Sequence, residues 1–206
     1  RTRPGTLGRD ADGPAAAHGQ SAWTERRRGQ GSLDAPLTSL GRTQAEAAAA
    51  RLASLPAFDS VVASDLGRAV ETAEIITRRL ALAVATTDRR WREADAGAWQ
   101  GRLVGEIERD WPGWLAAGRR PSDFEPRERV VARAESALAD LGGGRHLVVT
   151  HSGLIRALVG SRSGVERRVP NLDGVWFQVT EGEITVGASF TTDAAPPAGE
   201  DRLQEG

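Results

Sequence analysis

Leu147-Val148-Val149-Thr150-His151-Ser152-Gly153 is the stretch that decides the fold of this chain of 206 residues. The apolar run 147–150 is typical of a buried strand, and a helix expected over 154–159 follows it directly. The same order recurs earlier, where a strand predicted at 60–64 leads into a helix predicted at 66–80. Strands that alternate with helices indicate a mainly parallel sheet covered on both faces, so we expect a three-layer α/β/α fold.

Further elements extend this pattern along the chain. The spacing of small apolar residues predicts helices over 41–55 and 127–141, and the second ends at three consecutive glycines. A weak strand is expected at 83–86, the tryptophan-bearing region 102–120 is expected to be helical in part, and two strands at 175–179 and 183–186 form a closing hairpin. These elements belong to one domain over residues 18–190, with a flexible tail over 191–206.

Residues 1–17 do not fit this pattern. They hold two prolines and three glycines, and Leu7 is their one large apolar residue. This composition indicates an aberrant or disordered arm. The first strand of the sheet is therefore poorly encoded.

The composition excludes several classes of protein. All 27 basic residues are arginine, and the chain has no cysteine. The absence of cysteine rules out a disulfide scaffold, a thiolate nucleophile and a cysteine-bound metal. A net charge of −1 with interspersed signs argues against a nucleic-acid partner. No apolar run approaches the roughly 18 residues of a membrane span, so we expect a cytoplasmic protein without a membrane partner.

Two histidines occur where ligands gather in α/β sheets. His151 follows a strand and precedes a helix, where backbone N–H groups attract anions. A histidine that only caps the helix is an equal alternative. His18 lies in 17–23, Ala-His-Gly-Gln-Ser-Ala-Trp, and taken alone such a histidine is more often structural. His146, at the start of a strand, is interpreted as a surface or edge residue.

Two charged residues also suggest chemistry. Arg68 falls in the first turn of the helix predicted at 66–80, where a guanidinium and the helix dipole together suit a phosphate. A surface ion pair with Glu71 or Glu74 is the ordinary alternative. Glu93 lies in 92–101, Arg-Glu-Ala-Asp-Ala-Gly-Ala-Trp-Gln-Gly, and a partly buried carboxyl there suits proton transfer.

In this order and spacing, the pieces resemble the histidine phosphatase superfamily, in the branch of phosphoglycerate mutases and small broad-specificity phosphatases. The resemblance extends over roughly residues 17–179. Its most specific stretches are 18–23, 34–42, 64–73, 92–101 and 148–153. It implies a phosphoglycerate mutase-like fold.

The resemblance also implies a mechanism. His18 would attack phosphorus and form a phosphohistidine, Glu93 would protonate the leaving oxygen, and Arg68 and His151 would hold the phosphoryl oxygens. No metal or other cofactor is implied, because cationic side chains take that role. The loop positions that match substrate-binding residues are Gln30, Gly31 and Ser21, whereas Thr24 replaces an asparagine found in many members. The implied partner is a small phosphorylated substrate, and the sequence does not indicate an oligomeric state.

The length between Glu93 and His151 separates two activities of this family. Only 57 residues lie between them, and the resembling mutases carry a longer insertion that shields the phosphoenzyme from water. A short cover favours hydrolysis, so we expect a phosphatase. Contacts from Trp111, Trp114, Arg119 and Arg120 are candidates for setting substrate preference, although tryptophans here are more often core.

One position departs from the family. The resemblance implies an apolar first strand that ends in an arginine directly before the nucleophilic histidine, and this chain has Ala17 there. One explanation is a diverged, non-catalytic protein that still binds phosphorylated ligands. The other is a shifted reading frame upstream of His18 in a GC-rich gene, since one alternative decoding of codons 8–17 gives an apolar strand ending in arginine. Under both explanations the chain as written is expected to be impaired.

Overall fold

The computed structural model of the chain describes residues 10–83 and 85–191. Within these residues lies a six-stranded sheet with the order β3-β2-β4-β1-β5-β6. Strands β3, β2, β4 and β1 are parallel to one another, and β5 is antiparallel to both of its neighbours. The strands are β1 (Ala11–Ala17), β2 (Ser60–Ala63), β3 (Thr86–Thr87), β4 (Gly144–Thr150), β5 (Gly174–Thr180) and β6 (Glu183–Phe190).

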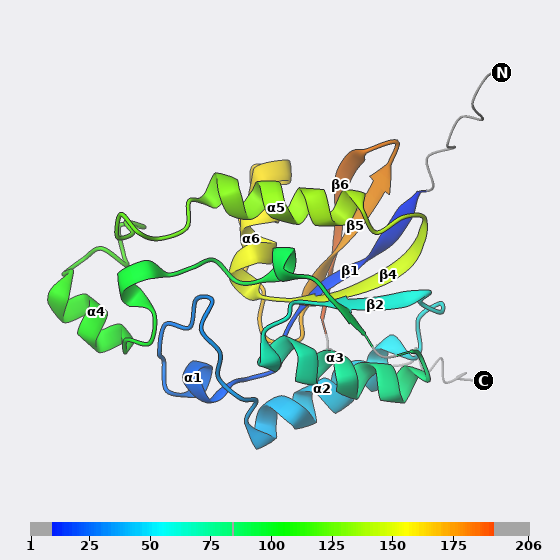
Figure 1. The fold of residues 1–206 in the computed structure, drawn as a ribbon, viewed down its shortest axis with the longest axis horizontal. Coiled ribbons are helices and arrows are strands. Elements are labelled where there is room, and N and C mark those ends of the chain that lie inside the picture. The colour runs from blue at the N-terminus through cyan, green and yellow to red at the C-terminus, as the bar shows by residue number, and fades with distance from the viewer. Residues whose placement is uncertain (1–9, 84, 192–206) are drawn as a thin grey trace, which may run out of the picture.

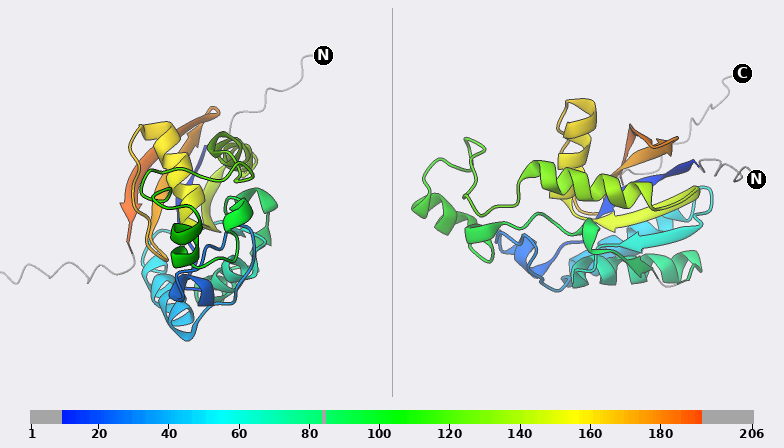
Figure 2. Two further views of the ribbon diagram at one scale, coloured as in Figure 1. Left: turned by 90° about the vertical axis from the view of Figure 1, so that its left-hand side faces the viewer. Right: turned by 45° about the horizontal axis from the view of Figure 1, so that its top comes forward.

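Helices cover both faces of this sheet, which confirms the three-layer α/β/α fold (Figures 1 and 2). Helices α2 and α3 pack on one face, and α5 and α6 pack together on the other. The helices are α1 (Ala22–Glu25), α2 (Ser39–Leu52), α3 (Gly67–Leu80), α4 (Val104–Asp110), α5 (Arg127–Ala139) and α6 (Ser152–Ser163), with short 3-10 helices η1 (Arg89–Trp91) and η2 (Gly97–Trp99).

Each face of the sheet has its own apolar core. On the side of α5 and α6, Ala15, Ala17 and Val148 pack with Leu154 and Leu158. On the side of α2 and α3, alternate strand residues such as Ala16 and Val149 pack with helix residues that include Leu52 and Ile76. The side chains of β1 therefore alternate between two cores, as expected for a strand buried on both faces.

The expectation of an aberrant or disordered arm over residues 1–17 is wrong for residues 11–17. These residues form β1, which is parallel to β4 and antiparallel to β5 and is almost entirely buried. Two complete neighbouring strands offer backbone donors and acceptors to this segment, and its small alanines fit between two helical layers. Tertiary pairing thus overrides a sequence with little strand propensity.

Pro14 interrupts the pairing of β1 with β4. The pairs between β1 and β4 include Asp12 with Arg145 and Ala15 with Val148, but neither Gly13 nor Pro14 has a partner there. Proline has no N–H to donate, so a ladder in the middle of a sheet is interrupted where it occurs. The first strand is formed in spite of its sequence.

The other expected elements are found with shifted ends. The helices expected over 41–55, 66–80 and 127–141 correspond to α2, α3 and α5, and the hairpin corresponds to β5 and β6. Helix α6 begins directly after His151 and is longer than expected. The weak strand lies at Thr86–Thr87, and α4 with following turns occupies the region 102–120.

Parts of three expectations fall outside the described residues. Residues 1–9 belong to the expected arm, residues 192–206 to the expected tail, and Val84 to the expected weak strand. Across the described part of the chain, no helix has the length and apolar character needed to cross a bilayer.

The parallel strands determine where the site lies. Strands β1, β2 and β4 end at Ala17, Ala63 and Thr150, and all three ends fall on the same edge of the sheet. The segments with α1 and α4 extend beyond this edge (Figures 1 and 2). Ligands of open α/β sheets bind at this edge.

Candidate active site

His18 is fixed at the end of β1 by backbone contacts. Its N–H donates to Thr150 O at 2.9 Å, and its ring is buried. The ring Nδ1 lies 2.6 Å from Gly19 O, and a carbonyl only accepts, so Nδ1 carries the proton. The other ring nitrogen, Nε2, therefore keeps its lone pair.

The lone pair of His18 faces Arg68. Arg68 Nε donates to His18 Nε2 at 3.2 Å. Burial lowers the pKa of His18 to about 3, and the charge of Arg68 lowers it further in the same direction. His18 is consequently neutral at physiological pH, which is the state a nucleophilic imidazole requires.

Arg68 is held in the first turn of α3 with its side chain almost wholly buried. Its guanidinium donates to Gly31 O at 2.9 Å and to Leu33 O at 2.7 Å, and lies 3.3 Å from Asp34 Oδ1. Asp34 also accepts from Gly67 N at 2.5 Å, which ties the start of α3 to the loop. These contacts fix the guanidinium plane beside His18.

His151 stands next to His18 at the end of β4. The two ring centroids are 5.1 Å apart with an edge-on geometry, and His151 is fully buried. Its Nε2 lies 2.8 Å from Ser64 Oγ, which itself accepts from Leu66 N at 3.3 Å. Burial and the charge of Arg68 lower the pKa of His151, so this ring is neutral as well.

One ring nitrogen of His151 is left for a ligand. Ser64 Oγ accepts from Leu66 N, and the Ser64 hydroxyl can donate its own proton to His151 Nε2. In that arrangement the single ring proton of neutral His151 is on Nδ1, and Nδ1 has no hydrogen-bond partner among the described residues. A buried polar atom without a partner is typical of a binding site.

Glu93 approaches the start of α6, directly after His151, from the loop after η1. Its carboxylate accepts from Gly153 N and from Ala94 N, each at 3.0 Å. A side chain at position 153 would overlap this carboxylate, so the glycine permits its approach to the start of α6. The half-buried Glu93 lines a cavity of about 640 Å³ together with Gln30, Gly31 and Gly153.

The loop residues proposed for substrate binding have separate environments. Gly31 has φ +56°, and a side chain there would overlap Ala96 and Gln100. Gln30 Nε2 donates to Thr24 Oγ1 at 2.7 Å, and Gln30 Oε1 has no partner in the described part of the chain. Ser21 is fully buried and caps α1 by accepting from Thr24 N at 3.2 Å.

The four candidate catalytic residues therefore come together. His18, Arg68 and His151 are in contact or share a buried cluster, and Glu93 is joined to the same edge through Gly153. The expectation that His146 is a surface or edge residue is wrong: it is buried at the opposite end of β4, which pairs with a strand on each side, and its Nδ1 is 2.9 Å from Ser60 Oγ. Trp111 and Trp114 pack against the small apolar cluster around Trp99, which agrees with the core interpretation.

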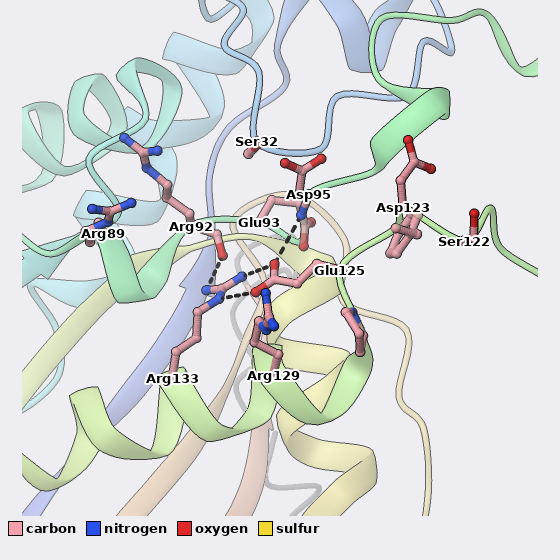
Figure 3. Close-up of a pocket in the computed structure, with 12 residues that line it drawn as sticks. Ser32, Arg89, Arg92, Glu93, Asp95, Ser122, Asp123, Glu125, Arg129 and Arg133 are labelled. Carbon is pink, nitrogen blue, oxygen red and sulfur yellow. Dashed lines mark hydrogen bonds and ion pairs between the residues drawn. The ribbon is translucent and has the colours of Figure 1, made fainter.

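Three residues of this site had no role assigned from the sequence. Ser64 orients His151, and Glu125 and Arg133 hold the loop that carries Glu93 (Figure 3). The stretch Ser64-Asp65-Leu66, which contributes to the family resemblance, was a local signal for Ser64. Glu125 and Arg133 bond to a segment that lies 30 to 43 positions earlier in the chain, and no local pattern indicates these contacts.

Comparison with known proteins agrees with this geometry. A model of the histidine phosphatase superfamily (branch 1) matches residues 16–179. The chain belongs to the histidine phosphatase superfamily. The match begins at Ala16, so it includes the end of β1 and His18.

Individual relatives of this superfamily carry two kinds of name. The chain is 38% identical over 158 residues to a glucosyl-3-phosphoglycerate phosphatase of Mycobacterium tuberculosis, covering 68% of this chain and 70% of the relative. It is 36% identical over 152 residues to phosphoglycerate mutase-like protein 4 of Arabidopsis thaliana, covering 68% and 66%. The native structure of a mycobacterial glucosyl-3-phosphoglycerate phosphatase matches with a TM-score of 0.74 and 30% identity, covering 86% of this chain and 96% of that one.

The position before the histidine nevertheless differs from what the resemblance implies. Ala17 is buried, and its backbone bonds to Asp173 O and Leu172 N at 2.9 and 3.0 Å. Its methyl group belongs to the core on the side of α5 and α6. No guanidinium is supplied to His18 from this position.

Proposed function

We propose that this member of the superfamily is a metal-independent phosphomonoesterase that acts through a phosphohistidine at His18. The observation that carries the proposal is the state of His18, a buried neutral imidazole with its proton on Nδ1 and its Nε2 lone pair beside a fixed guanidinium. Such a nitrogen can attack an electrophile without first losing a proton.

The first step transfers the phosphoryl group to the enzyme. His18 Nε2 forms a bond to phosphorus while the bond from phosphorus to the ester oxygen breaks, and Glu93 gives its proton to the leaving oxygen. Arg68 and the Nδ1 proton of His151 donate to the phosphoryl oxygens, where negative charge is concentrated. Cationic and N–H donors thus take the role that a metal ion plays in other phosphatases.

The second step releases phosphate. Glu93 takes a proton from water as the water oxygen attacks phosphorus, and the bond to His18 Nε2 breaks with the electron pair returning to the ring. His18 is again neutral and Glu93 is again protonated. Each residue therefore regains its initial state after one turnover.

The cover over the site supports hydrolysis over phosphoryl transfer to a second substrate. Of the 57 residues between Glu93 and His151, those from α5 to β4 belong to the sheet and its covering helix, and only residues 94–126 are left to cover the site. A short cover leaves the phosphohistidine accessible to water. Some relatives are named as mutases, and mutase activity would need a cover that excludes water from the phosphohistidine.

The cavity beside Glu93 supports a small phosphorylated metabolite as substrate. Its lining includes Arg120, whose guanidinium lies 5.3 Å from the centre of the Trp99 ring, and Arg156. Burial lowers the pKa of Arg120, and the neighbouring charge of Arg156 acts in the same direction. A second anionic group on the substrate would relieve this repulsion, which fits a phosphorylated carboxylic acid such as the one in the name of the mycobacterial relative.

Alanine in place of arginine at position 17 leads us to expect reduced activity of this chain. A missing donor to the transition-state oxygens costs about 3 kcal/mol, or on the order of 10²-fold in rate. The second candidate function is non-catalytic binding of phosphorylated ligands through Arg68 and His151. This candidate also rests on Ala17.

Hydrolysis of an aryl phosphate in the presence of a chelator tests the proposal. We expect slow release of phosphate that His18→Ala abolishes and that His146→Asn, at the other end of β4, leaves unchanged. Turnover that survives His18→Ala would contradict the proposal, and so would turnover that needs an added divalent metal. Binding of phosphate without any turnover would favour the second candidate, and isomerisation of phosphoglycerate would favour a mutase.

A further inference from the structure

Arg133 of α5 reaches the loop that carries the proposed acid Glu93. Its Nη1 donates to Arg92 O at 2.6 Å and to Arg90 O at 2.7 Å. The first of these carbonyls belongs to the residue directly before Glu93. Figure 3 shows the guanidinium pointing from the helix into this loop. Arg133 therefore holds the backbone of Glu93, not its carboxylate.

Glu125 fixes Arg133 from the other side. Its two carboxylate oxygens lie 2.9 and 3.0 Å from Nε and Nη2 of Arg133, a paired geometry in which both side chains are largely buried. Glu125 Oε2 also accepts from Asp95 N at 3.1 Å, and Glu125 N donates to Asp95 O at 2.8 Å. Burial would raise the pKa of Glu125, but the Arg133 guanidinium holds it below its usual range, so the pair remains ionised.

These contacts enclose Glu93 on both sides along the chain. Position 92 is bonded to Arg133 and position 95 to Glu125, so the two residues hold a backbone segment with Glu93 inside it. Asp65 holds the Arg92 side chain at 2.6 and 2.7 Å, which anchors the same segment to the end of β2. The Glu93 carboxylate itself meets two backbone N–H groups, from Gly153 and Ala94.

This geometry separates positioning from proton transfer. The carboxylate of Glu93 needs a fixed place near the leaving oxygen, because proton transfer requires hydrogen-bond distance. A guanidinium bonded to that carboxylate would compete for the proton-accepting oxygen. Arg133 fixes the place through two carbonyl oxygens and adds no charged donor to the Glu93 carboxylate, which meets only the N–H groups of Ala94 and Gly153 among the hydrogen bonds of the described residues.

We propose that Arg133, oriented by Glu125, is a positioning residue for Glu93 in the phosphatase reaction. The proposal rests on the proposed function, in which Glu93 protonates the leaving oxygen. Arg133 does not touch the reacting atoms. Its loss is therefore expected to affect those steps that need the Glu93 proton.

Leaving groups of different basicity test this role. In single-turnover formation of the phosphoenzyme, Arg133→Met is expected to slow glycerol 3-phosphate on the order of 10²-fold, the contribution of a general acid. The same variant is expected to change p-nitrophenyl phosphate little, because nitrophenolate leaves without a proton. Arg133→Lys keeps a donor for the carbonyl oxygens, so it is expected to slow the reaction of glycerol 3-phosphate less than Arg133→Met does.

Arg90→Met is the matched control. Arg90 joins the same loop to the same helix through Ser136 and Asp140, at 3.0 and 2.6 Å, but its side chain does not hold the carbonyl before Glu93. It is expected to show no selectivity between the two substrates. Equal slowing of both substrates by Arg133→Met would overturn the proposal, as would the same selectivity in Arg90→Met.

Hydrogen exchange of the Gly153 amide tests the positioning without turnover. This N–H donates to Glu93 Oε2, so Arg133→Met is expected to speed its exchange at least tenfold, and Arg90→Met is not. Unchanged exchange in Arg133→Met would overturn the positioning role. Faster exchange in a chain that forms no phosphoenzyme would contradict the proposed function and leave the positioning role standing.

Discussion

Ala17 and His18 are consecutive residues with different surroundings. The methyl group of Ala17 packs in the core with Val148 and Leu154, whereas the ring of His18 lies at the strand end beside Arg68 and His151. A longer side chain at position 17 would start from the residue next to the proposed nucleophile, His18. This position therefore decides how many cations face a bound phosphoryl group.

Restoring an arginine at this position is expected to raise activity. Ala17→Arg adds a donor for the phosphoryl oxygens, so kcat/KM for p-nitrophenyl phosphate should rise about 10²-fold. Ala17→Gln, which has length without charge, should give no comparable gain. Turnover that is the same with alanine and with arginine would show that this account of the phosphate pocket is wrong.

The sequence indicated the candidate catalytic residues better than the residues that hold them in place. Arg68 and His151 follow recognisable strands and Glu93 follows a weak one, whereas His18 was indicated by its motif without a recognisable strand before it; the parallel strands then bring these positions to one edge. The contact of His151 with Ser64 spans 87 positions, and that of Arg133 with Arg92 spans 41. Such contacts depend on how helices pack on the sheet, which no local pattern in these residues expresses.

At the scale of elements, β1 is the main difference between expectation and structure. The apolar run of β4 and the periodic pattern of α3 identify those elements directly, and both are found. Asp-Gly-Pro at 12–14 is typical of a turn. The strand forms because β4 and β5 pair with it on either side, and the local sequence does not indicate these neighbours. Element type was therefore predictable where the local pattern and the tertiary environment agree.

Gly13 makes the central pairing possible and provides a test of it. Its φ is +155°, and a side chain there would overlap the backbone carbonyl oxygen of His146 in β4. Gly13→Ala is expected to lower the free energy of unfolding by about 3 kcal/mol or more, because backbone must move in the middle of the sheet. Urea unfolding measures the loss.

A glycine outside the sheet provides the control. Gly182 also has a positive φ, +84°, in the turn between β5 and β6, and a side chain there would meet nothing within 4 Å. Gly182→Ala is expected to cost about 1 kcal/mol, the usual penalty of the left-handed region. Equal losses in the two variants would mean that Gly13 is not packed against β4.

For the whole molecule, two buried neutral histidines make stability depend on pH. The pKa of His18 is about 3 in the fold and the pKa of His151 is also lowered, whereas in the unfolded chain both return to their ordinary value of 6.5. Below pH 6.5 the unfolded chain therefore binds more protons than the folded one. The stabilisation is present above pH 6.5 and is lost as the pH falls.

Between pH 6.5 and pH 5 the free energy of unfolding is expected to fall. The slope approaches about 1.4 kcal/mol per pH unit for each buried histidine, and urea unfolding at several pH values measures it. His18→Asn should flatten the slope by about half. A free energy of unfolding that is constant or rises on acidification over this interval would contradict the buried neutral state of both rings.

The phosphohistidine itself is the most direct test of the account. The protein is mixed with p-nitrophenyl phosphate, quenched in alkaline denaturant, digested and examined by mass spectrometry. We predict one added phosphoryl group on the peptide that contains His18, labile in acid and absent from His18→Ala. A phosphoryl group on another residue, or hydrolysis without any phosphorylated peptide, would contradict the central claim.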